Sequence, residues 1–276
     1  MSSAAAASGR SALSVLMTGG GSGIGKGVAM WLAGKGHHVW VTDLDAGAAR
    51  ATADAIGSAG GSAEGMALDV TDDAAVGSLV RELPKLDAVI NNAGMQHVER
   101  LEDFPPEKWR KLVDLMLCGP AVLTARCLPR FREQNFGRII NLGSIHSVVA
   151  SPYKSAYVSA KHGIVGLTKT VALETADADI TINTVCPSYV LTPLVEKQIN
   201  DTARVRNLAP EEVVKQVMLK PMYVFICALT DDNAIAKHAE PRAQIGIRAE
   251  GTLQCPPPGE QTSSGDRICT PICGPS

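Results

Sequence analysis

The sequence predicts an α/β protein whose single domain is built on a doubly wound parallel sheet. Short, nearly continuous apolar runs alternate with helical patterns along most of the chain, as they do where helices cover both faces of such a sheet. Acidic, amide or hydroxyl side chains follow several of these runs directly. Ligands of parallel sheets bind beyond the carboxyl ends of the strands, so these side chains are the first candidates for a site.

The predicted elements follow one another in a regular order. The first strand, residues 13–17, passes through a glycine-rich turn into a helix that ends at Gly34 and Gly36. A second strand at 37–45 carries Asp43 near its carboxyl end, and a helix at 46–56 follows. The helix at 71–83 opens with Thr71 as its predicted N-cap. The other predicted strands are 62–70, 86–94, 137–144 and 180–188, and the other predicted helices are 106–135 and 155–176.

The bulk properties restrict the kind of protein and its partners. The chain has 276 residues and a formal net charge of −2, which gives no support to a nucleic-acid partner or an anionic membrane. No apolar run reaches the roughly 18 residues of a membrane span, and the N-terminus lacks the basic start of a secretory signal. We therefore expect a cytoplasmic protein with a loose tail at residues 1–12 and its domain at residues 13–222.

The seven cysteines do not predict a disulfide scaffold, because their number is odd and no secretory signal precedes them. Cys118, Cys127 and Cys186 stand in apolar contexts and are expected to be buried thiols. We expect no metal site, since the spacing of the three last cysteines matches no common zinc pattern. Those cysteines are Cys255, Cys269 and Cys273.

Residues 18–25, TGGGSGIG, form a glycine-rich loop between the first strand and its helix. Glycines allow a tight turn and let backbone N–H groups approach a pyrophosphate at the helix N-terminus. Asp43 lies about 20 residues further on, where an acid accepts hydrogen bonds from the adenosine ribose and repels a 2′-phosphate. Neither the loop nor the residues just after Asp43 offer an arginine, so the pattern favours NAD over NADP. The alternative for Asp43 is a helix N-cap or a solvated turn acid.

The stretch SPYKSAYVSAKHG, residues 151–163, places Tyr157 four residues before Lys161 and three after Lys154. On a helix these positions share one face, so the phenol and both amines could point into one site. A solvated helix face is the common alternative, and the spacing alone does not exclude it.

Four motifs resemble those of the short-chain dehydrogenase/reductase family in order and spacing: the loop at 18–25, NNAG at 91–94, Ser144, and Tyr157-x-x-x-Lys161. The resemblance covers residues 13–222 and implies a Rossmann-like fold with a nicotinamide cofactor. It implies that Tyr157 exchanges a proton with the substrate oxygen, that Ser144 polarises that oxygen, and that Lys161 lowers the phenol pKa and holds the nicotinamide ribose. The cofactor-binding residues that it implies are Thr18, Gly19, Ser22, Gly23, Ile24, Gly25, Asp43, Asp69, Val70, Asn91, Ala93, Gly94, Tyr157, Lys161, Pro187, Val190 and Thr192.

A narrower resemblance, over residues 144–199, is to the members of that family that oxidise (R)-3-hydroxybutyrate to acetoacetate with NAD. A small hydroxy acid of this kind needs a cation and several donors at its carboxylate and the acid/base group at its hydroxyl. The resemblance implies, less directly, a lid built from Tyr189, Leu191, Thr192 and Val195. The substrate-binding residues that it implies are Gln96, Ser144, His146, Lys154, Tyr157 and Gln198. Taken singly, such Gln and Lys residues are usually solvated, and a lone His is usually structural.

Two features depart from the family. Many members have an Asn whose backbone carbonyl binds a water of the proton relay, and Met116 stands at the matching position. Any residue supplies a carbonyl, so Met116 stays among the predicted catalytic residues; the alternative is that it fills a helix interface. After Met222 the helix, seventh strand and Gly-Gly turn of the family do not follow. We expect a poorly ordered segment at 223–276, from a shifted reading frame or a replaced terminus, and a sheet without its last strand.

Two other functions stay open on the sequence. A short-chain reductase of 3-oxoacyl thioesters would prefer NADPH and would have no use for the carboxylate-binding residues. A catalytically silent NAD-binding protein would result if the altered terminus prevented the fold or the assembly from closing. The predicted partner is a small hydroxy acid, and the family implies a homotetramer if the C-terminus permits one.

Overall fold

A computed structural model describes residues 12–190 and 192–214, together with the backbone of 224–226 and 245–247. Several predictions therefore lie outside the described residues. They are the tail at 1–11, the lid residue Leu191, the three cysteines Cys255, Cys269 and Cys273, and most of the segment 223–276.

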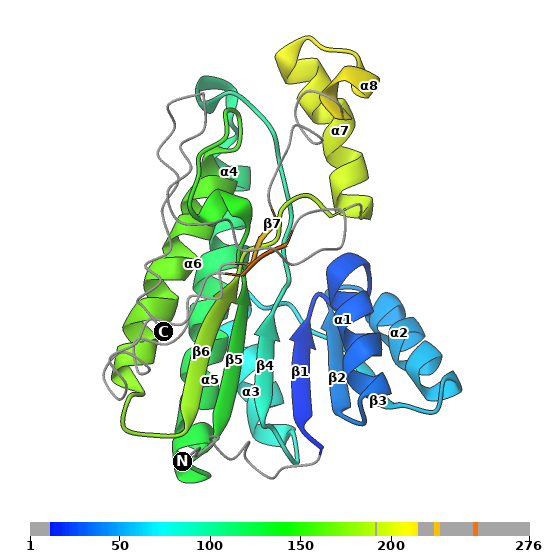
Figure 1. The fold of residues 1–276 in the computed structure, drawn as a ribbon, viewed down its shortest axis with the longest axis vertical. Helices are drawn as coiled ribbons and strands as arrows, with labels where there is room; N and C mark the ends of the chain where they lie inside the picture. Colours follow the sequence, from blue (N-terminus) through cyan, green and yellow to red (C-terminus); the bar gives the residue numbers. More distant parts are fainter. Residues whose placement is uncertain (1–11, 191, 215–223, 227–244, 248–276) are drawn as a thin grey trace, which may run out of the picture. The chain divides into compact units, whose positions relative to one another are not determined.

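Six strands form one parallel sheet, which confirms the predicted α/β class (Figure 1). The strands are β1 (Ser14–Thr18), β2 (His38–Asp43), β3 (Ser62–Ala67), β4 (Ala88–Asn91), β5 (Gly137–Leu142) and β6 (Ile180–Val185). Their order is β3-β2-β1-β4-β5-β6, and β1 pairs in parallel with both β2 and β4. The order therefore reverses between β1 and β4, which is where doubly wound sheets bind their ligands.

Burial along the strands follows their position in the sheet. All five residues of β1 and all four of β4 are buried, whereas β3, at the edge, has no buried residue. Strands that are covered on both faces need continuous apolar runs, which is why the sequence pattern for β1 and β4 was strong. The described sheet ends at β6 on its other edge.

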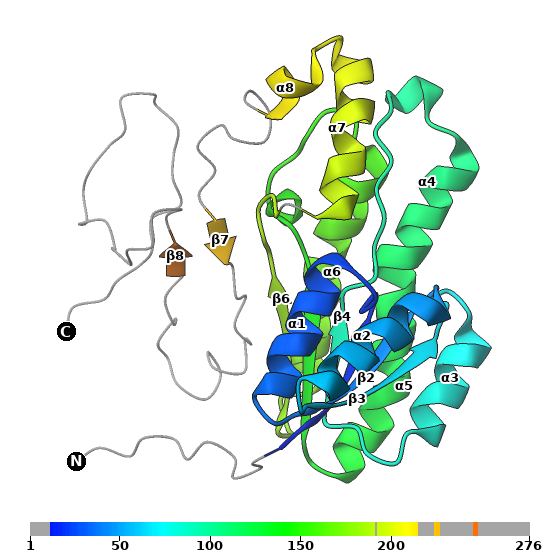
Figure 2. The same ribbon diagram turned by 90° about the vertical axis from the view of Figure 1, so that its right-hand side faces the viewer.

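Within this fold the chain forms two compact units. The first unit comprises residues up to Gly94 and Cys118–Ile139, and the second comprises Met95–Leu117 and residues from Ile140 onward. In the first unit α2 packs on β2 and β3, and α3 packs against α5 (Figure 2). Its helices are α1 (Gly23–Gly34), α2 (Ala46–Ser58), α3 (Asp73–Glu82) and α5 (Gly119–Glu133).

In the second unit α4 packs against α6, α6 packs on β6, and α7 packs against α8. These helices are α4 (Pro106–Val113), α6 (Ser155–Glu174), α7 (Pro193–Arg206) and α8 (Pro210–Val213). The sequence pattern did not predict α7 and α8 as helices. Nor did it predict the short antiparallel pair of β7 (Val224–Ile226) and β8 (Ile245–Ile247).

Three local predictions are wrong. The N-cap of α3 is Asp72, which accepts from the N–H groups of Ala74 and Ala75; the Thr71 hydroxyl donates to Asp69 instead. The predicted helix at 106–135 is interrupted by a π-helical turn, η2 (Asp114–Cys118). Within that turn Met116 is buried and Cys118 is exposed, so Cys118 is not the buried thiol that its apolar neighbours predicted.

One helical stretch among the described residues, Pro106–Glu133, is long and apolar enough to cross a membrane by composition alone. Charged residues interrupt this stretch, so the sequence shows no continuous apolar run of that length. Both ends of the stretch have partners: α4 packs against α6, and α5 packs against α3. Core helices of globular proteins pass the same test, so the finding is weak evidence for a membrane span.

Candidate functional site

The loop between β1 and α1 has backbone geometry that favours glycine. Gly19 has a φ of 63° and Gly23 a φ of 52°, in the left-handed region that other residues rarely adopt. A Cβ on Gly25 would collide with the carbonyl oxygen of Gly19. Ser22 is the N-cap of α1, and its side chain makes no capping hydrogen bond. The first N–H groups of α1 therefore face an anion-binding position without a side-chain cap.

Thr18 and Asn92 fix this loop to the end of β4. The Asn92 side-chain amide donates to the carbonyl oxygens of Thr18 (2.9 Å) and Gly19 (3.0 Å). Thr18 Oγ1 accepts from the backbone N–H groups of Asn92 (3.0 Å) and Ala93 (3.1 Å). Asn92 lies within the NNAG motif, but the sequence indicated no role for it. Its side chain holds the backbone at the start of the glycine loop in place.

Asp43 lies at the end of β2 beside the same loop. Its Oδ2 accepts from the Gly21 N–H at 3.0 Å, and its Oδ1 accepts from the Asp45 N–H at 3.1 Å. The N-cap of α2 is Asp45, so the capping alternative for Asp43 is wrong. The loop, the N-terminus of α1 and this carboxylate fit the diphosphate and ribose of a dinucleotide.

The other predicted cofactor residues of the first unit lie at strand ends. Asp69 and Val70 follow β3, and Asp69 Oδ1 accepts from the Thr71 N–H at 2.9 Å and from its hydroxyl at 2.7 Å. Asn91 is buried at the end of β4. Ala93 and Gly94 follow it directly.

In the second unit, Ser144 begins a turn that follows β5. It is the N-cap of η3 (Ile145–Ser147), where its Oγ accepts from the His146 N–H at 3.2 Å and its own N–H donates to Ser147 Oγ at 3.1 Å. This capping box fixes the backbone of the turn. The Ser144 hydroxyl is close enough to that of Tyr157 to lower the phenol pKa. The two hydroxyls that the sequence assigned to the reacting oxygen therefore lie together.

The surroundings of Tyr157 favour its neutral phenol. Burial raises the pKa of Tyr157, and the nearby Ser144 hydroxyl only partly opposes this. Lys161 Nζ lies 5.6 Å from the centre of the Tyr157 ring and donates to the Leu142 carbonyl oxygen at 2.5 Å. Burial thus opposes the lowered phenol pKa that the resemblance implies, which stays a prediction for the site with its nicotinamide bound. Burial also lowers the pKa of Lys161 itself to about 8.

Lys154 is a buried ammonium held by two neutral groups. Only 4% of the residue is exposed, and its Nζ donates to Tyr189 Oη at 3.1 Å and to Gln198 Oε1 at 3.2 Å. No carboxylate within the described ranges pairs with it. Burial lowers the pKa of Lys154 to about 8, and the charge of Arg206 adds to this effect. Lys154 is the N-cap of α6, so it directly precedes the helix, which begins at Ser155 as predicted.

The His146 ring lies close to the rings of Tyr157 and Tyr189. Its ring centre is 6.2 Å from those of Tyr157 and Tyr189, with both contacts near perpendicular. Both ring nitrogens are buried, and neither makes a well-formed hydrogen bond among the described residues, although the Val149 backbone is close enough to act against the fall in pKa. Burial and the nearby charge of Lys154 lower the pKa of His146 to about 4. A neutral imidazole therefore stands beside the Lys154 ammonium with its hydrogen-bonding capacity unused.

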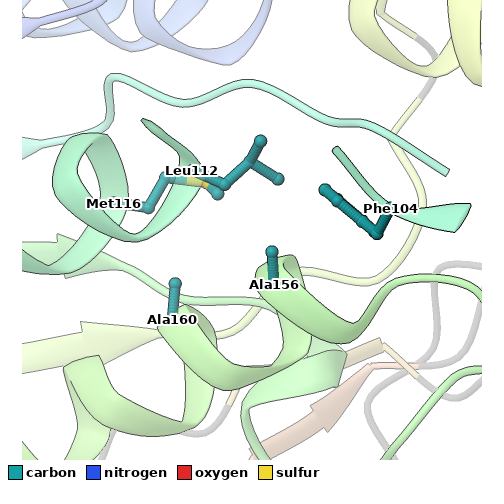
Figure 3. Close-up of a cluster of buried hydrophobic side chains, with 5 residues drawn as sticks. All are labelled: Phe104, Leu112, Met116, Ala156 and Ala160. Carbon is teal, nitrogen blue, oxygen red and sulfur yellow. The ribbon is translucent and has the colours of Figure 1, made fainter. Parts of the chain in front are cut away.

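Met116 fills an apolar cluster between η2 and α6. Figure 3 shows its side chain with those of Leu112, Phe104, Ala156 and Ala160, and the Tyr157 ring packs against the same cluster. This is the helix-interface role that the sequence analysis weighed as the alternative.

The remaining predicted residues take separate places. Gln96 is half-buried, and its Oε1 accepts from the His97 N–H at 3.1 Å. The Pro187 carbonyl accepts from the Ile145 N–H at 2.9 Å. Thr192 is the N-cap of α7, and Val190 is exposed. Among the described side chains, no three His, Cys, Asp or Glu residues come together as a metal site would require.

Arg206 is a residue near this site that the sequence analysis missed. It lowers the pKa of Lys154 through its charge, and its Nε is buried without a partner within the described part of the chain. Gln198 and Arg206 are eight residues apart in α7, so they lie on one helix face. That spacing was the only signal in the sequence that could have found Arg206.

A family model described as short chain dehydrogenase matches residues 14–203. Two relatives are D-beta-hydroxybutyrate dehydrogenases. The one from Rhizobium meliloti is 42% identical over 211 residues, which cover 74% of this chain and 82% of the relative. The one from Cupriavidus necator is 41% identical over 215 residues, which cover 74% of this chain and 81% of the relative.

More distant similarities point to reductases of the same fold. A 3-oxoacyl-[acyl-carrier-protein] reductase from Vibrio cholerae is 33% identical over 198 residues, which cover 70% of this chain and 80% of the relative. The crystal structure of an actinorhodin polyketide ketoreductase with NADPH matches with a TM-score of 0.70 and 30% identity, over 75% of this chain and 81% of that one.

Proposed function

Since this chain belongs to the short-chain dehydrogenase family, we propose that it oxidises (R)-3-hydroxybutyrate to acetoacetate with NAD as the hydride acceptor. Two relatives that are 41% and 42% identical carry the name D-beta-hydroxybutyrate dehydrogenase. The residues around Lys154 give an independent physical argument for the same class of substrate.

The observation that carries the proposal is the buried Lys154 ammonium without an acidic partner among the described residues. A buried charge is costly unless an opposite charge compensates it. A substrate carboxylate would supply that charge. Gln198 and Tyr189 already hold the ammonium in place, and His146 has unused ring nitrogens beside it. Gln96 would add an amide donor at the same carboxylate.

The reacting hydroxyl would lie at Ser144 and Tyr157. When bound, the nicotinamide nucleotide supplies the acceptor for the hydride that leaves the carbinol carbon. Tyr157 would take the hydroxyl proton, while the Ser144 hydroxyl donates to the same substrate oxygen as it becomes a carbonyl. Because burial raises the pKa of Tyr157, the phenolate needs positive charge nearby, and the Lys161 ammonium is the cation that this chain offers. The backbone carbonyl of Met116 would hold a water that passes the proton on.

Asp43 supports NAD as the preferred cofactor. Its carboxylate is fixed by the N–H of Gly21 at the glycine loop, where it would accept from ribose hydroxyls and repel a 2′-phosphate. We expect Asp69 and Val70 to lie at the adenine and Pro187, Val190 and Thr192 at the nicotinamide. A homotetramer and a cytoplasmic location belong to the same proposal.

The test is NADH formation by the purified full chain with NAD and each enantiomer of 3-hydroxybutyrate. We expect turnover of the (R) acid, and a loss of kcat by about 10²–10⁴-fold in Tyr157→Phe. NAD should still bind to that variant, since the glycine loop and Asp43 are unchanged. Activity on 3-oxoacyl thioesters with NADPH, and none on the hydroxy acid, would establish the reductase alternative. NAD binding without turnover of either substrate would identify a catalytically silent protein.

A further inference from the structure

Tyr153, which directly precedes Lys154, has a strained backbone. Its φ is 69°, in the left-handed region that a bulky side chain rarely adopts. Such a conformation persists only where the surroundings impose it, and it occurs most often at functional sites.

Two arginines hold the Tyr153 ring. The guanidinium carbon of Arg100 lies 6.0 Å from the ring centre, and that of Arg206 lies 5.7 Å from it. Guanidinium groups at such distances are attracted to the ring by cation–π interactions. Arg100 comes from the loop that precedes α4, whereas Arg206 comes from the last turn of α7. The ring thus connects two segments that are about a hundred residues apart.

Glu99 ties the same segments together through the backbone. Its N–H donates to the Tyr153 carbonyl oxygen at 2.9 Å, and its carboxylate pairs with Arg204 of α7 at 2.9 Å. We refer to Glu99, Arg100, Tyr153, Arg204 and Arg206 as the Tyr153 clamp. It fixes both the backbone and the ring of Tyr153. No hydrogen bond involves the Tyr153 hydroxyl within the described residues, so the ring faces carry the contact.

The Tyr153 clamp determines the position of Lys154 in two ways. The left-handed residue sets the direction in which the chain enters Lys154 and α6. Arg204 and Arg206 also anchor the C-terminal end of α7, the helix that carries Gln198, the acceptor for Lys154 Nζ. The Tyr153 clamp therefore fixes the positions of both Lys154 and Gln198, the two partners of this hydrogen bond.

We infer that Tyr153 is a positioning residue, which aims the Lys154 ammonium at the carboxylate of the substrate. This inference rests on the proposed function, since it assigns Lys154 to a carboxylate. It goes beyond the family resemblance, which marks Lys154 and Gln198 and says nothing of what aims them.

Two substitutions separate the ring from the backbone strain. Asn adopts the left-handed region more readily than other non-glycine residues, so Tyr153→Asn keeps the backbone and removes the ring. Tyr153→Phe keeps both and removes only the hydroxyl. We expect Tyr153→Asn to raise the KM for (R)-3-hydroxybutyrate by roughly 10-fold with little change in kcat, and Tyr153→Phe to match the wild type. An unchanged KM in Tyr153→Asn would overturn the inference.

A double-mutant cycle tests whether Tyr153 acts through Lys154. In a Lys154→Gln background we expect Tyr153→Asn to change KM no further, because the group that it aims is gone. An equal rise of KM in both backgrounds would show that Tyr153 supports the fold in general, and the inference would fail.

A readout without substrate separates this inference from the proposed function. The pH dependence of Lys154 acetylation by acetic anhydride, read by peptide mass spectrometry, follows its amine. In the wild type and Tyr153→Phe it should titrate near pH 8. In Tyr153→Asn we expect it to titrate higher, because the buried position beside Arg206 is lost. If the wild type does not oxidise 3-hydroxybutyrate, the proposed function fails, and this titration alone decides the inference. An unchanged titration would overturn it.

Discussion

At the scale of single residues, the second unit buries two amines with pKa values only slightly above neutral pH, and an imidazole that is uncharged at that pH. Burial lowers the pKa of Lys154 and of Lys161 to about 8, and that of His146 to about 4. A lysine with a pKa of about 8 changes charge within the range in which dehydrogenases are assayed. The charge of the Lys154 site therefore depends on pH.

The dependence of kcat/KM on pH should show this charge. The pKa of Lys154 is lowered from 10.5 to about 8, so the ammonium is fully present below about pH 7 and is lost as pH rises through 8. We expect kcat/KM for (R)-3-hydroxybutyrate to fall above pH 8, because kcat/KM reports the free enzyme. Lys161 titrates in the same range, so a comparison with a Lys154 variant is needed.

Lys154→Gln provides that comparison. At pH 7 its kcat/KM should be lower by about 10–100-fold, the worth of a charged hydrogen bond. Above pH 8 its profile should fall less steeply than that of the wild type, since only Lys161 is left to lose its charge. Parallel profiles for the two proteins would contradict the assignment of Lys154 to the carboxylate.

At this scale the sequence indicated which side chains come together around Lys154, but not the contacts and the burial that surround them. His146, Lys154 and Gln198 were expected together from the resemblance, and the structure brings them together. Tyr153 and Arg206 were missed, because a left-handed φ and a ring held between two arginines depend on contacts across the unit. The burial that raises the pKa of Tyr157 was also missed, since burial is a tertiary property.

At the scale of elements, the glycine loop offers a matched pair of substitutions within α1. A Cβ on Gly25 would collide with the Gly19 carbonyl, whereas a Cβ on Gly27 meets nothing within 4 Å. We expect Gly25→Ala to weaken NAD binding by at least about 10-fold, because the loop must move away from its diphosphate-binding shape. Gly27→Ala should bind NAD normally and unfold at a higher temperature, since Ala is the better helix former.

Calorimetric titration of NAD into both variants measures this difference. The thermal midpoint of each variant, taken without NAD, shows whether the fold survived. Equal NAD affinities in two folded variants would mean that the loop does not bind the diphosphate.

The π-helical turn η2 offers a test of Met116. Its side chain is 2% exposed and packs among Leu112, Phe104 and two alanines of α6. Met116→Ala should lower the free energy of unfolding by about 2–4 kcal/mol, the range for large-to-small core changes. Met116→Leu should cost less than about 1.5 kcal/mol. Because only the backbone carbonyl is assigned to the proton relay, kcat should change little in Met116→Leu.

Urea unfolding and steady-state kinetics on both variants check this prediction. A large loss of kcat in a stable Met116→Leu protein would show that the Met116 side chain itself takes part in the reaction.

The elements that periodicity could reveal were predicted, and those that depend on tertiary contacts were not. All six strands of the main sheet and the helices α1 to α6 have counterparts in the apolar pattern. The π-helical turn was missed because its residues continue a helical pattern, and α7 because its sequence is mainly polar outside the buried Gln198 face.

At the scale of the whole molecule, the two units are interleaved along the chain. Each unit contains a segment that lies between parts of the other in sequence, and β5 contributes residues to both. No single cleavage of the chain would separate one unit from the other. The sequence predicted one domain but gave no sign of this interleaving, since contacts between distant segments leave no periodic pattern.

We expect the two units to unfold in one cooperative transition. Trp40 reports on the first unit, where its indole N–H donates to Ser14 Oγ at 2.8 Å, and Trp109 reports on the second, where it donates to Ser155 Oγ at 3.2 Å. Variants that keep only one of them, with Trp31 replaced by Phe in both, should give fluorescence transitions at the same urea concentration. Two separate midpoints would show that the units are stable independently.

The interleaving also has a consequence for synthesis on the ribosome. The first 94 residues emerge early and include four strands, but α5, which packs against α3, is encoded only after the segment Met95–Leu117. Until α5 has been synthesised, the apolar face of α3 in the nascent first unit therefore stays uncovered. During that interval the chain is exposed to self-association, so slower translation through residues 95–139 should prolong this exposure.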